Sequence, residues 1–462
     1  ACVGPSLLPL MNRFLVVIAA LLNGIALPAG AWAASTEETK PEAAPFHRVE
    51  SARPATRPDA EILQARIARI DTELRDGILK FWLDHTRDPE RGGFYGLITN
   101  DLVVRKDAPR GALLSARILW TFSAAFRRYH DPKYLEMARW AHADLQQHFR
   151  DKEHGGLYWM VSADGVPIDA RKILYVQSFG VYALSEFYRA TGETAVRDEA
   201  VALYRLIEEQ AHDREHRGYF EEFTRDWKIS RDRGRRGSAM GSLDQKSQNV
   251  HIHMLEAYTN LLRAWPDDGL RQNLRELIDV LTTRVLDTST HHLRLFLAED
   301  WTPKSDTISF GHDIEFAWLI TESAEVLGDE ALLAKIKPLA VKMARTTLEE
   351  GVDLEGGVMA EADPHGVIDT FREWWPQAEA TVGFLNAYQI SGDEAYLRQS
   401  LRSWDFIATH LIDRRHGDWY QGVTATGEVR VPFKVSFWKC PYHNSRACME
   451  QIDRLTAILQ AR

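Results

Sequence analysis

Cysteine is scarce in this chain, with three residues among 462. Cys2 precedes a predicted leader, so only Cys440 and Cys448 belong to the predicted folded part. On one helix these two residues would be about 12 Å apart, at a rise of 1.5 Å per residue, which is too far for a disulfide. We therefore expect free thiols and a fold that is stabilised by its hydrophobic core.

An excess of positive charge is also missing. Lys and Arg total 56 against 66 Asp and Glu, which gives a formal net charge of −10. The one basic cluster, Arg231 to Arg236, is short and mixed with glycine, and it predicts a solvated loop. Because no basic stripe could follow a phosphate backbone, we expect no nucleic-acid partner.

Long apolar runs are absent apart from one that covers residues 14–27. It follows a positively charged start at residues 11–13 and precedes the small-x-small pattern of residues 31–33. These features predict a signal peptide over residues 1–33, with residues 1–10 as a start-site extension before the true initiator. We therefore expect export to the periplasm or secretion by a bacterium, without stable membrane insertion after cleavage. An uncleaved membrane anchor is the alternative.

Residues 34–60 lack an apolar period and are rich in Pro, Ala, Glu and Ser, which predicts a flexible linker. Over the whole chain, 45% of residues are hydrophobic and 26% are charged, as in a soluble globular protein with a sizeable core. We therefore predict one folded domain over residues 61–462.

A glycine followed by aromatic or apolar residues recurs along this domain. Its five clear copies have their glycines at positions 93, 156, 218, 357 and 417, so the steps are 63, 62, 139 and 60 residues. The long step equals about two periods, and its midpoint lies near residues 291–299, where residues 292–296 look like a degenerate copy. Six copies at a regular period indicate a repeat architecture.

Between the copies, apolar residues recur at helical spacing, as in residues 113–129, 176–188 and 316–326. A second helix of each unit is predicted after a turn with glycine or proline that leads into acidic residues. Six helical hairpins predict an all-α fold, an (α/α)6 barrel with an inner and an outer ring of helices. An open helical solenoid is the alternative, and such barrels host both hydrolases and isomerases.

Two clusters of polar residues lie on predicted inner helices. Asn249, His253 and Glu256 have the spacing i, i+4, i+7 and share one helical face, which indicates either a lined cavity or a satisfied buried network. His312 and Glu315 are one turn apart, so we expect the carboxylate to orient the imidazole and raise its pKa. The same spacing can hold a metal, but no second pair or His-Glu-x-x-His motif accompanies it, and we predict no metal site.

A third cluster precedes the last predicted helix. Pro441 indicates a loop that leads into this helix, so His443 is expected near the helix start, at the barrel mouth. Cys440 beside His443 could be a nucleophile, although no third member or oxyanion motif is evident.

Two further positions combine polar and aromatic groups. Trp375 offers a stacking plane near the carboxylate of Glu379. Aromatic residues at the density found in this chain often line carbohydrate sites, but they also fill barrel cores. Arg117 places a cation on an inner helix, where it needs an anionic partner; a developing enolate or a structural salt bridge would serve.

Six stretches of the sequence, which include most residues of the polar clusters described above, resemble the N-acylglucosamine 2-epimerase superfamily, and within it most closely the cellobiose 2-epimerases. The resemblance covers nearly all of residues 100–450, in order, while the loop at 231–241 departs from the family pattern. The matching stretches are RILWTFSAAFR (117–127), YVQSFGVYALSEFYRATG (175–192), HIHMLEAYTNLLRAW (251–265), SFGHDIEFAWL (309–319), EWWPQAEATVGFLNAYQ (373–389) and FWKCPYHNSRACME (437–450).

The resemblance implies a mechanism in which one histidine removes the C2 proton of an opened sugar and another returns a proton on the opposite face. His443 would be the base, and His312 its partner. His253 and Glu315 would assist ring opening and proton relay. The expected substrate-binding residues are Arg117, Tyr175 and Asn249 for the reacting oxygens, Trp375 and Trp438 for stacking, and Glu379.

We therefore expect an epimerase that inverts C2 of the reducing-end glucose of cellobiose or a related disaccharide, such as lactose or mannobiose, through an enediolate. It would act as a monomer without a metal or nicotinamide cofactor, since no Gly-x-Gly-x-x-Gly follows a strand. The alternatives are a mannose isomerase or N-acylglucosamine 2-epimerase, an inverting glycoside hydrolase that uses two of Glu256, Glu315 and Glu379, and a glycan-binding protein without turnover.

Overall fold

The computed structural model describes residues 59–230 and 246–461, which belong to one compact unit. The predicted signal peptide, the loop at 231–241 and all but the last two residues of the predicted linker lie outside the described residues. Within the described part, no helix combines the length and apolarity needed to span a bilayer.

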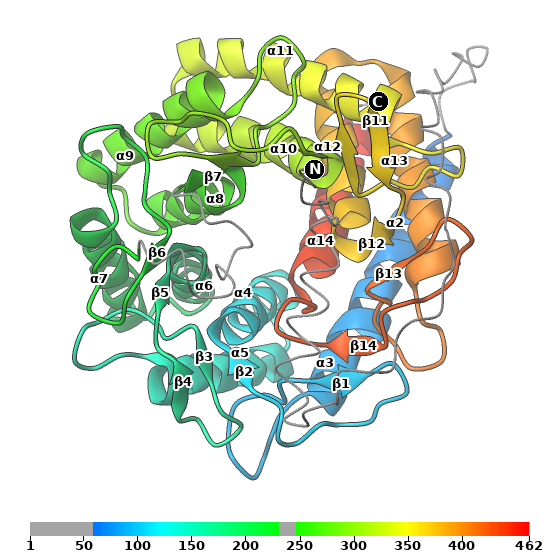
Figure 1. The fold of residues 1–462 in the computed structure, drawn as a ribbon. Coiled ribbons are helices and arrows are strands. Elements are labelled where there is room, and N and C mark those ends of the chain that lie inside the picture. Colours follow the sequence, from blue (N-terminus) through cyan, green and yellow to red (C-terminus); the bar gives the residue numbers. More distant parts are fainter. Residues whose placement is uncertain (1–58, 231–245, 462) are drawn as a thin grey trace, which may run out of the picture. The chain divides into compact units, whose positions relative to one another are not determined.

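Six described helices form an inner ring, in which each contacts the next and the last contacts the first. Figure 1 shows this ring from one end. The inner helices are α4 (Ala112–Tyr129), α6 (Leu174–Thr191), α8 (Gln248–Ala264), α10 (Phe310–Leu327), α12 (Trp374–Ser391) and α14 (Tyr442–Gln460).

An outer ring covers the inner one. Each outer helix packs against the inner helix of its own unit, and α9 and α11 also contact the next inner helix. Helix α2, from the start of the described chain, packs on α14 from its end, which closes the circle. The outer helices are α2 (Ala60–Thr72), which continues through η1 (Glu73–Leu79) into α3 (Lys80–His85), α5 (Pro132–Asp144), α7 (Thr194–Gln210), α9 (Asp268–Val280), α11 (Glu330–Thr346) and α13 (Glu394–Phe406). Wide π-helical turns end four of them, at η2 (Leu145–Phe149), η3 (Leu281–Val285), η4 (Thr347–Gly351) and η5 (Ile407–Leu411). The predicted (α/α)6 barrel is confirmed.

The two rings differ in their apolar patterns because they differ in their neighbours. In α6 the buried residues run without a break from Leu174 to Phe187, since an inner helix is covered on nearly every side. Outer helix α9 buries Leu270, Leu274 and Leu277 on one stripe, as an amphipathic helix does. Each such leucine contributes about 1.5–3 kcal/mol by leaving water.

The same type of turn follows each outer helix of the described chain. The backbone N–H of an aspartate donates to a carbonyl four or five residues on, and its Oδ1 accepts the N–H two residues on. The six aspartates are Asp88, Asp151, Asp213, Asp287, Asp353 and Asp413. The Asp287 turn confirms the degenerate sixth copy, in which His291 takes a φ of 65°, a left-handed conformation that a non-glycine residue adopts only with strain.

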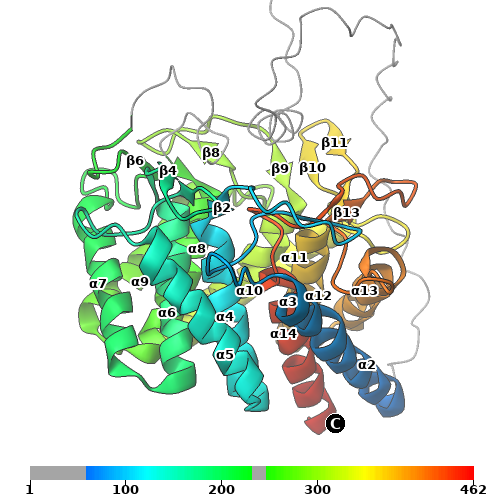
Figure 2. The same cartoon turned by 90° about the horizontal axis from the view of Figure 1, so that it is seen from below.

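Short antiparallel strands join neighbouring units and gather at the end where the inner helices begin, as Figure 2 shows. In each sheet, a strand that leads into an inner helix pairs with one that follows an outer helix. The two-stranded sheets are β1 (Ile98–Thr99) with β14 (Phe433–Val435), β5 (Lys172–Ile173) with β6 (Glu222–Phe223), β7 (Lys246–Ser247) with β8 (Phe296–Leu297), and β12 (Arg372–Glu373) with β13 (Gly422–Val423). The three-stranded sheets are β2 (Arg110–Gly111), β3 (Met160–Val161) and β4 (Pro167–Asp169), and β9 (Ile308–Ser309), β10 (Glu361–Asp363) and β11 (Gly366–Asp369).

The fourth residue of four inner helices anchors one of these turns by accepting a backbone N–H from it. The pairs are Gln177 with Leu157 (2.8 Å), His251 with Tyr219 (3.0 Å), Asp313 with Leu293 (2.8 Å) and Gln377 with Val358 (2.6 Å). This anchoring sets the rotation of each helix about its axis. Residues two and six share the opposite side of the helix, so they are turned toward the barrel interior. The buried imidazole of His251 is thus one of these anchors.

Candidate active site

The sixth residues of five inner helices meet in a ring around the barrel axis. These residues are Arg117, Phe179, His253, Glu315 and Glu379. The Arg117 guanidinium lies 4.3 Å from the centroid of the Phe179 ring, and that ring centroid is 5.0 Å from His253. On α14, the fifth residue, Arg446, completes the ring by contacting both glutamates.

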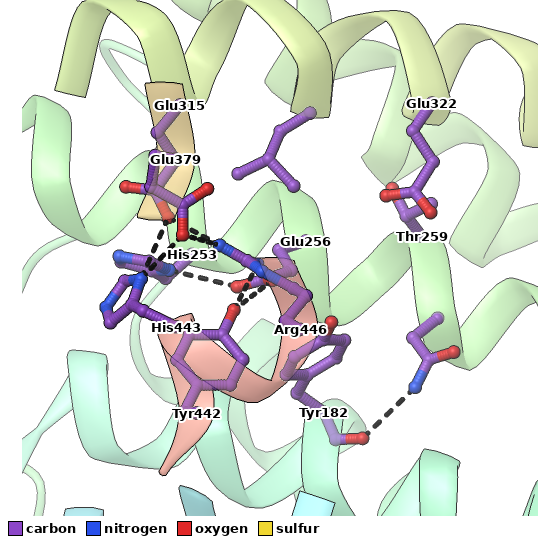
Figure 3. Close-up of polar contacts among 12 residues, drawn as sticks. Tyr182, His253, Glu256, Thr259, Glu315, Glu322, Glu379, Tyr442, His443 and Arg446 are labelled. Carbon is purple, nitrogen blue, oxygen red and sulfur yellow. Dashed lines mark hydrogen bonds and ion pairs between the residues drawn. The ribbon is translucent and has the colours of Figure 1, made fainter. Parts of the chain in front are cut away.

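Arg446 is the centre of the polar cluster in Figure 3. Its Nη2 donates to Oε1 of Glu315 (2.8 Å) and of Glu379 (2.7 Å). Its Nη1 donates to Glu256 and to the hydroxyl of Tyr442, and this hydroxyl also donates to Glu256. One buried cation therefore holds three buried carboxylates, which is an incomplete charge balance.

This imbalance moves the pKa values of the carboxyl groups in different directions. Burial, together with the neighbouring charge of Glu379, raises the pKa of Glu315 well above its ordinary value. Burial also acts to raise the pKa of Glu256, but Arg446 and His253 outweigh it and lower that pKa. Burial thus favours the protonated form of Glu315, while Arg446 and His253 favour the charged form of Glu256.

His443 is the second residue of α14 and pairs with Glu379. Its Nδ1 lies 2.7 Å from Glu379 Oε1, while the other oxygen of Glu379 accepts from Trp318 Nε1 at 2.9 Å. A carboxylate at Nδ1 holds the proton there, which leaves Nε2 as the basic nitrogen. Burial, with added repulsion from Arg117 and Arg446, lowers the pKa of His443 well below its ordinary value, so this imidazole is neutral.

His312 lies close to the same space but has a different partner. Its Nδ1 is 2.8 Å from Ser309 Oγ, and burial lowers its pKa to about 3. The prediction that Glu315 raises the pKa of His312 is therefore wrong, because the Glu315 oxygen turns toward Arg446 instead. The indole of Trp375 contacts both imidazoles, with ring centroids 4.6 Å from His312 and 5.8 Å from His443.

Arg117 has no carboxylate partner among the described residues. Its Nη2 donates to the hydroxyl of Tyr175 (2.6 Å), its Nη1 contacts Cys440 Sγ at 3.6 Å, and its Nε is buried without a partner. The structural salt bridge considered for this residue is thus not formed with any described side chain. Cys440 and Cys448 are both free, as predicted, and both are buried.

The remaining predicted residues lie around this centre. His253 Nδ1 is 3.0 Å from Glu256 Oε2, and burial lowers the pKa of His253. Trp438 packs beside Tyr175, with ring centroids 5.9 Å apart. Asn249, the second residue of α8, has a buried Oδ1 without a partner.

Sequence reasoning missed Arg446, although a signal for it was present. It lies one turn after His443, at the fifth position of its helix, next to the sixth position that holds Arg117, His253 and Glu315 in other units. Comparing the first turns of the inner helices with one another would have drawn attention to it.

A metal fits this centre poorly. Donor atoms of Glu315, Glu379 and His443 lie within 4.8 Å of one another, which is the geometry of a possible cation site. However, Arg446 Nη2 already contacts both carboxylates. The guanidinium is therefore the cation that this set of residues binds.

Fold and site together define an (α/α)6-barrel enzyme with buried imidazole–carboxylate pairs. The chain belongs to the N-acylglucosamine 2-epimerase family, whose model matches residues 92–447. It is 43% identical over 392 residues to the cellobiose 2-epimerase of Bacteroides fragilis, an alignment that covers 84% of this chain and 98% of that protein.

Solved structures agree with this membership. The cellobiose 2-epimerase of Bacillus thermoamylovorans superposes with a TM-score of 0.80 at 39% identity, covering 85% of this chain and all of that one. A D-mannose isomerase superposes with a TM-score of 0.73 at 21% identity, covering 86% and 98%, a likeness of fold alone. The protein is therefore an isomerase, a carbohydrate 2-epimerase.

Proposed function

We propose that this protein inverts C2 of the reducing-end glucose of cellobiose, or of a related disaccharide such as lactose or mannobiose, and converts cellobiose to glucosyl-mannose. Two cellobiose 2-epimerases align with this chain over 98% and 100% of their own lengths, which supports a disaccharide as the substrate. The observation that carries the chemistry is the pair of neutral imidazoles, the half-buried His312 and the buried His443, in contact with one indole.

The first step removes a proton from carbon. In the open-chain sugar, the hydrogen at C2 is acidic because it is adjacent to the aldehyde. His443 Nε2 takes this proton, the bonding electrons form an enediolate, and Glu379 at Nδ1 stabilises the resulting imidazolium. Arg117, which has no carboxylate partner, places its charge on the developing oxyanion, an interaction of about 3–4 kcal/mol in comparable sites.

The second step returns a proton to the other face of C2 from His312, which must first be protonated. The charge of the enediolate beside it raises the pKa of His312, so that this imidazole takes a proton from solvent and delivers it to C2. Glu315, one turn along the same helix, assists the proton relay. His443 gives the C2 proton that it holds at Nε2 back to solvent, which restores both imidazoles to their resting state. His253 assists ring opening.

The sugar rings occupy the aromatic walls of the site. Trp375 and Trp438 stack on them, while Tyr175, Asn249 and Glu379 hold hydroxyl oxygens. The unpartnered Oδ1 of Asn249 supports this assignment, since a buried acceptor without a donor is costly unless a ligand supplies one.

Inverting hydrolysis is less well supported. It requires carboxyl groups about 6.5–9.5 Å apart. Glu315 and Glu379 both place an oxygen within 2.8 Å of one nitrogen of Arg446, which holds them closer together than that.

The test is incubation of the purified protein with cellobiose in D2O, followed by NMR. We expect glucosyl-mannose with deuterium at C2 and no new reducing ends. Release of glucose would establish a hydrolase, and an unchanged spectrum would establish a protein without turnover on this sugar.

We also propose that the chain is an exported monomer, in which residues 1–33 are removed, residues 34–60 act as a linker and residues 61–462 fold as one domain. The leader pattern supports export. Cell fractionation with N-terminal sequencing tests it, and light scattering tests the monomer. A cytoplasmic, uncleaved chain would contradict the proposal.

A further inference from the structure

A second cavity lies at the opposite end of the barrel, where the inner helices finish. Its volume is about 370 Å³, within the range of small-molecule pockets and equal to roughly a dozen waters at about 30 Å³ each. Its wall comes from the last turns of α4, α6 and α8, and includes Ala124, Glu186, Arg189 and Asn260.

The floor of this cavity separates it from the proposed reaction centre. Trp120, Tyr182 and Trp318 line the floor, together with Arg446. In Figure 3, Glu322, which also lines the cavity, lies on the side of Arg446 away from His443. The cavity and the proposed reaction centre therefore lie on different sides of the Arg446 side chain.

The wall alternates hydrogen-bond donors and acceptors in a connected chain. Arg127 donates to one oxygen of Glu186 at 2.6 Å, and Arg189 donates to the other at 2.7 Å and to Asn260 Oδ1 at 2.6 Å. Arg263 donates to Glu322 at 2.8 Å. Because these cations already face carboxylates, and the helix ends here carry partial negative charge, a bare anion is a poor match. Hydroxyl groups, which both donate and accept, fit this alternation.

Two buried donors at the floor have no acceptor. Trp120 Nε1 and Arg446 Nε lack any hydrogen-bond partner, and their residues are 7% and 3% exposed. Buried polar groups are nearly always satisfied. Both side chains line the cavity, and a small shift of either one would bring its nitrogen into reach of an oxygen atom inside it.

We propose that this cavity is a second binding site, which takes a neutral polyhydroxy molecule of monosaccharide size. An aromatic floor, alternating guanidinium and carboxylate groups on the wall, and two unsatisfied donors are its recognition elements. The site is distinct from the one at which the epimerisation is proposed, and its occupant would contact Arg446 on the side away from His443.

The test uses the full protein with its 14 tryptophans labelled with ¹⁵N at the indole. The Trp120 signal is identified by its loss in Trp120→Phe. The probe is myo-inositol, which has no carbonyl group and cannot be epimerised. We expect a saturable downfield shift of the Trp120 indole proton at millimolar inositol, because the ligand supplies the missing acceptor.

Two variants locate the response. Ala124→Phe fills the cavity and should abolish the shift while leaving the other indole signals in place; Ala124→Leu is the milder substitute if the larger side chain prevents folding. No shift with inositol, a shift that survives both variants, or a shift with sodium phosphate but not with inositol would each overturn the proposal.

Discussion

The two ends of the inner helices differ in how completely their arginines are paired with carboxylates. Where the helices begin, Arg446 serves three carboxylates and Arg117 has none among the described residues. Where they end, Arg127 and Arg263 each have a carboxylate partner. The proposed proton chemistry thus falls at the end where charge pairing is incomplete, and an unbalanced buried group either shifts its pKa or accepts a substrate charge as its partner.

The largest expected difference between the ends concerns stability. Arg446→Met should lower the free energy of unfolding by about 3–5 kcal/mol, since three buried carboxylates lose their cation. Arg263→Met, the matched change at the other end, should cost about 0–1 kcal/mol, because its ion pair is partly exposed. Urea unfolding of both variants checks the contrast, and equal losses would break it.

The next effect is on catalysis. Arg117→Met should lower kcat/KM for cellobiose by about 10²–10³-fold, with little change in the unfolding midpoint, because no carboxylate is left unpaired. Arg197→Met on outer helix α7 serves as the matched loss of an arginine and should leave turnover intact. A large loss of stability with normal turnover would show that Arg117 is structural.

A smaller expected effect is the pH dependence of stability at His292, a histidine with two carboxylate partners, unlike the histidines of the proposed reaction centre. His292 lies between Asp313 (2.7 Å) and Glu350 (3.1 Å). Burial acts to lower its pKa, but these two carboxylates raise it to about 9. Because the folded pKa exceeds the unfolded value of about 6.5, the stabilisation is complete below pH 6.5 and is lost as pH rises through 9.

His292→Gln should remove roughly 2–3 kcal/mol at pH 6 and little above pH 9.5. Thermal unfolding between these pH values measures the change. A loss that does not depend on pH would contradict the charged state of His292.

The parts of the fold that depend on local pattern were predictable. The glycine turns recur at a fixed period, and apolar residues recur at helical spacing between them. The contact between His443 and Glu379 was not predictable, because it joins helices 64 residues apart. The partner of His312 was predicted wrongly for a related reason. Glu315 has the spacing to contact His312, but its oxygen accepts a hydrogen bond from Arg446, which is 131 residues away in the sequence.

Deuterium exchange at C2 of cellobiose in two variants tests the central claim most directly. With His312→Asn, His443 remains, so the protein should exchange the C2 hydrogen of cellobiose for deuterium without producing glucosyl-mannose. With His443→Asn, cellobiose should keep its C2 hydrogen. If both variants epimerise cellobiose at the rate of the unaltered protein, or if His443→Asn alone still exchanges, the two histidines do not act on opposite faces of one carbon.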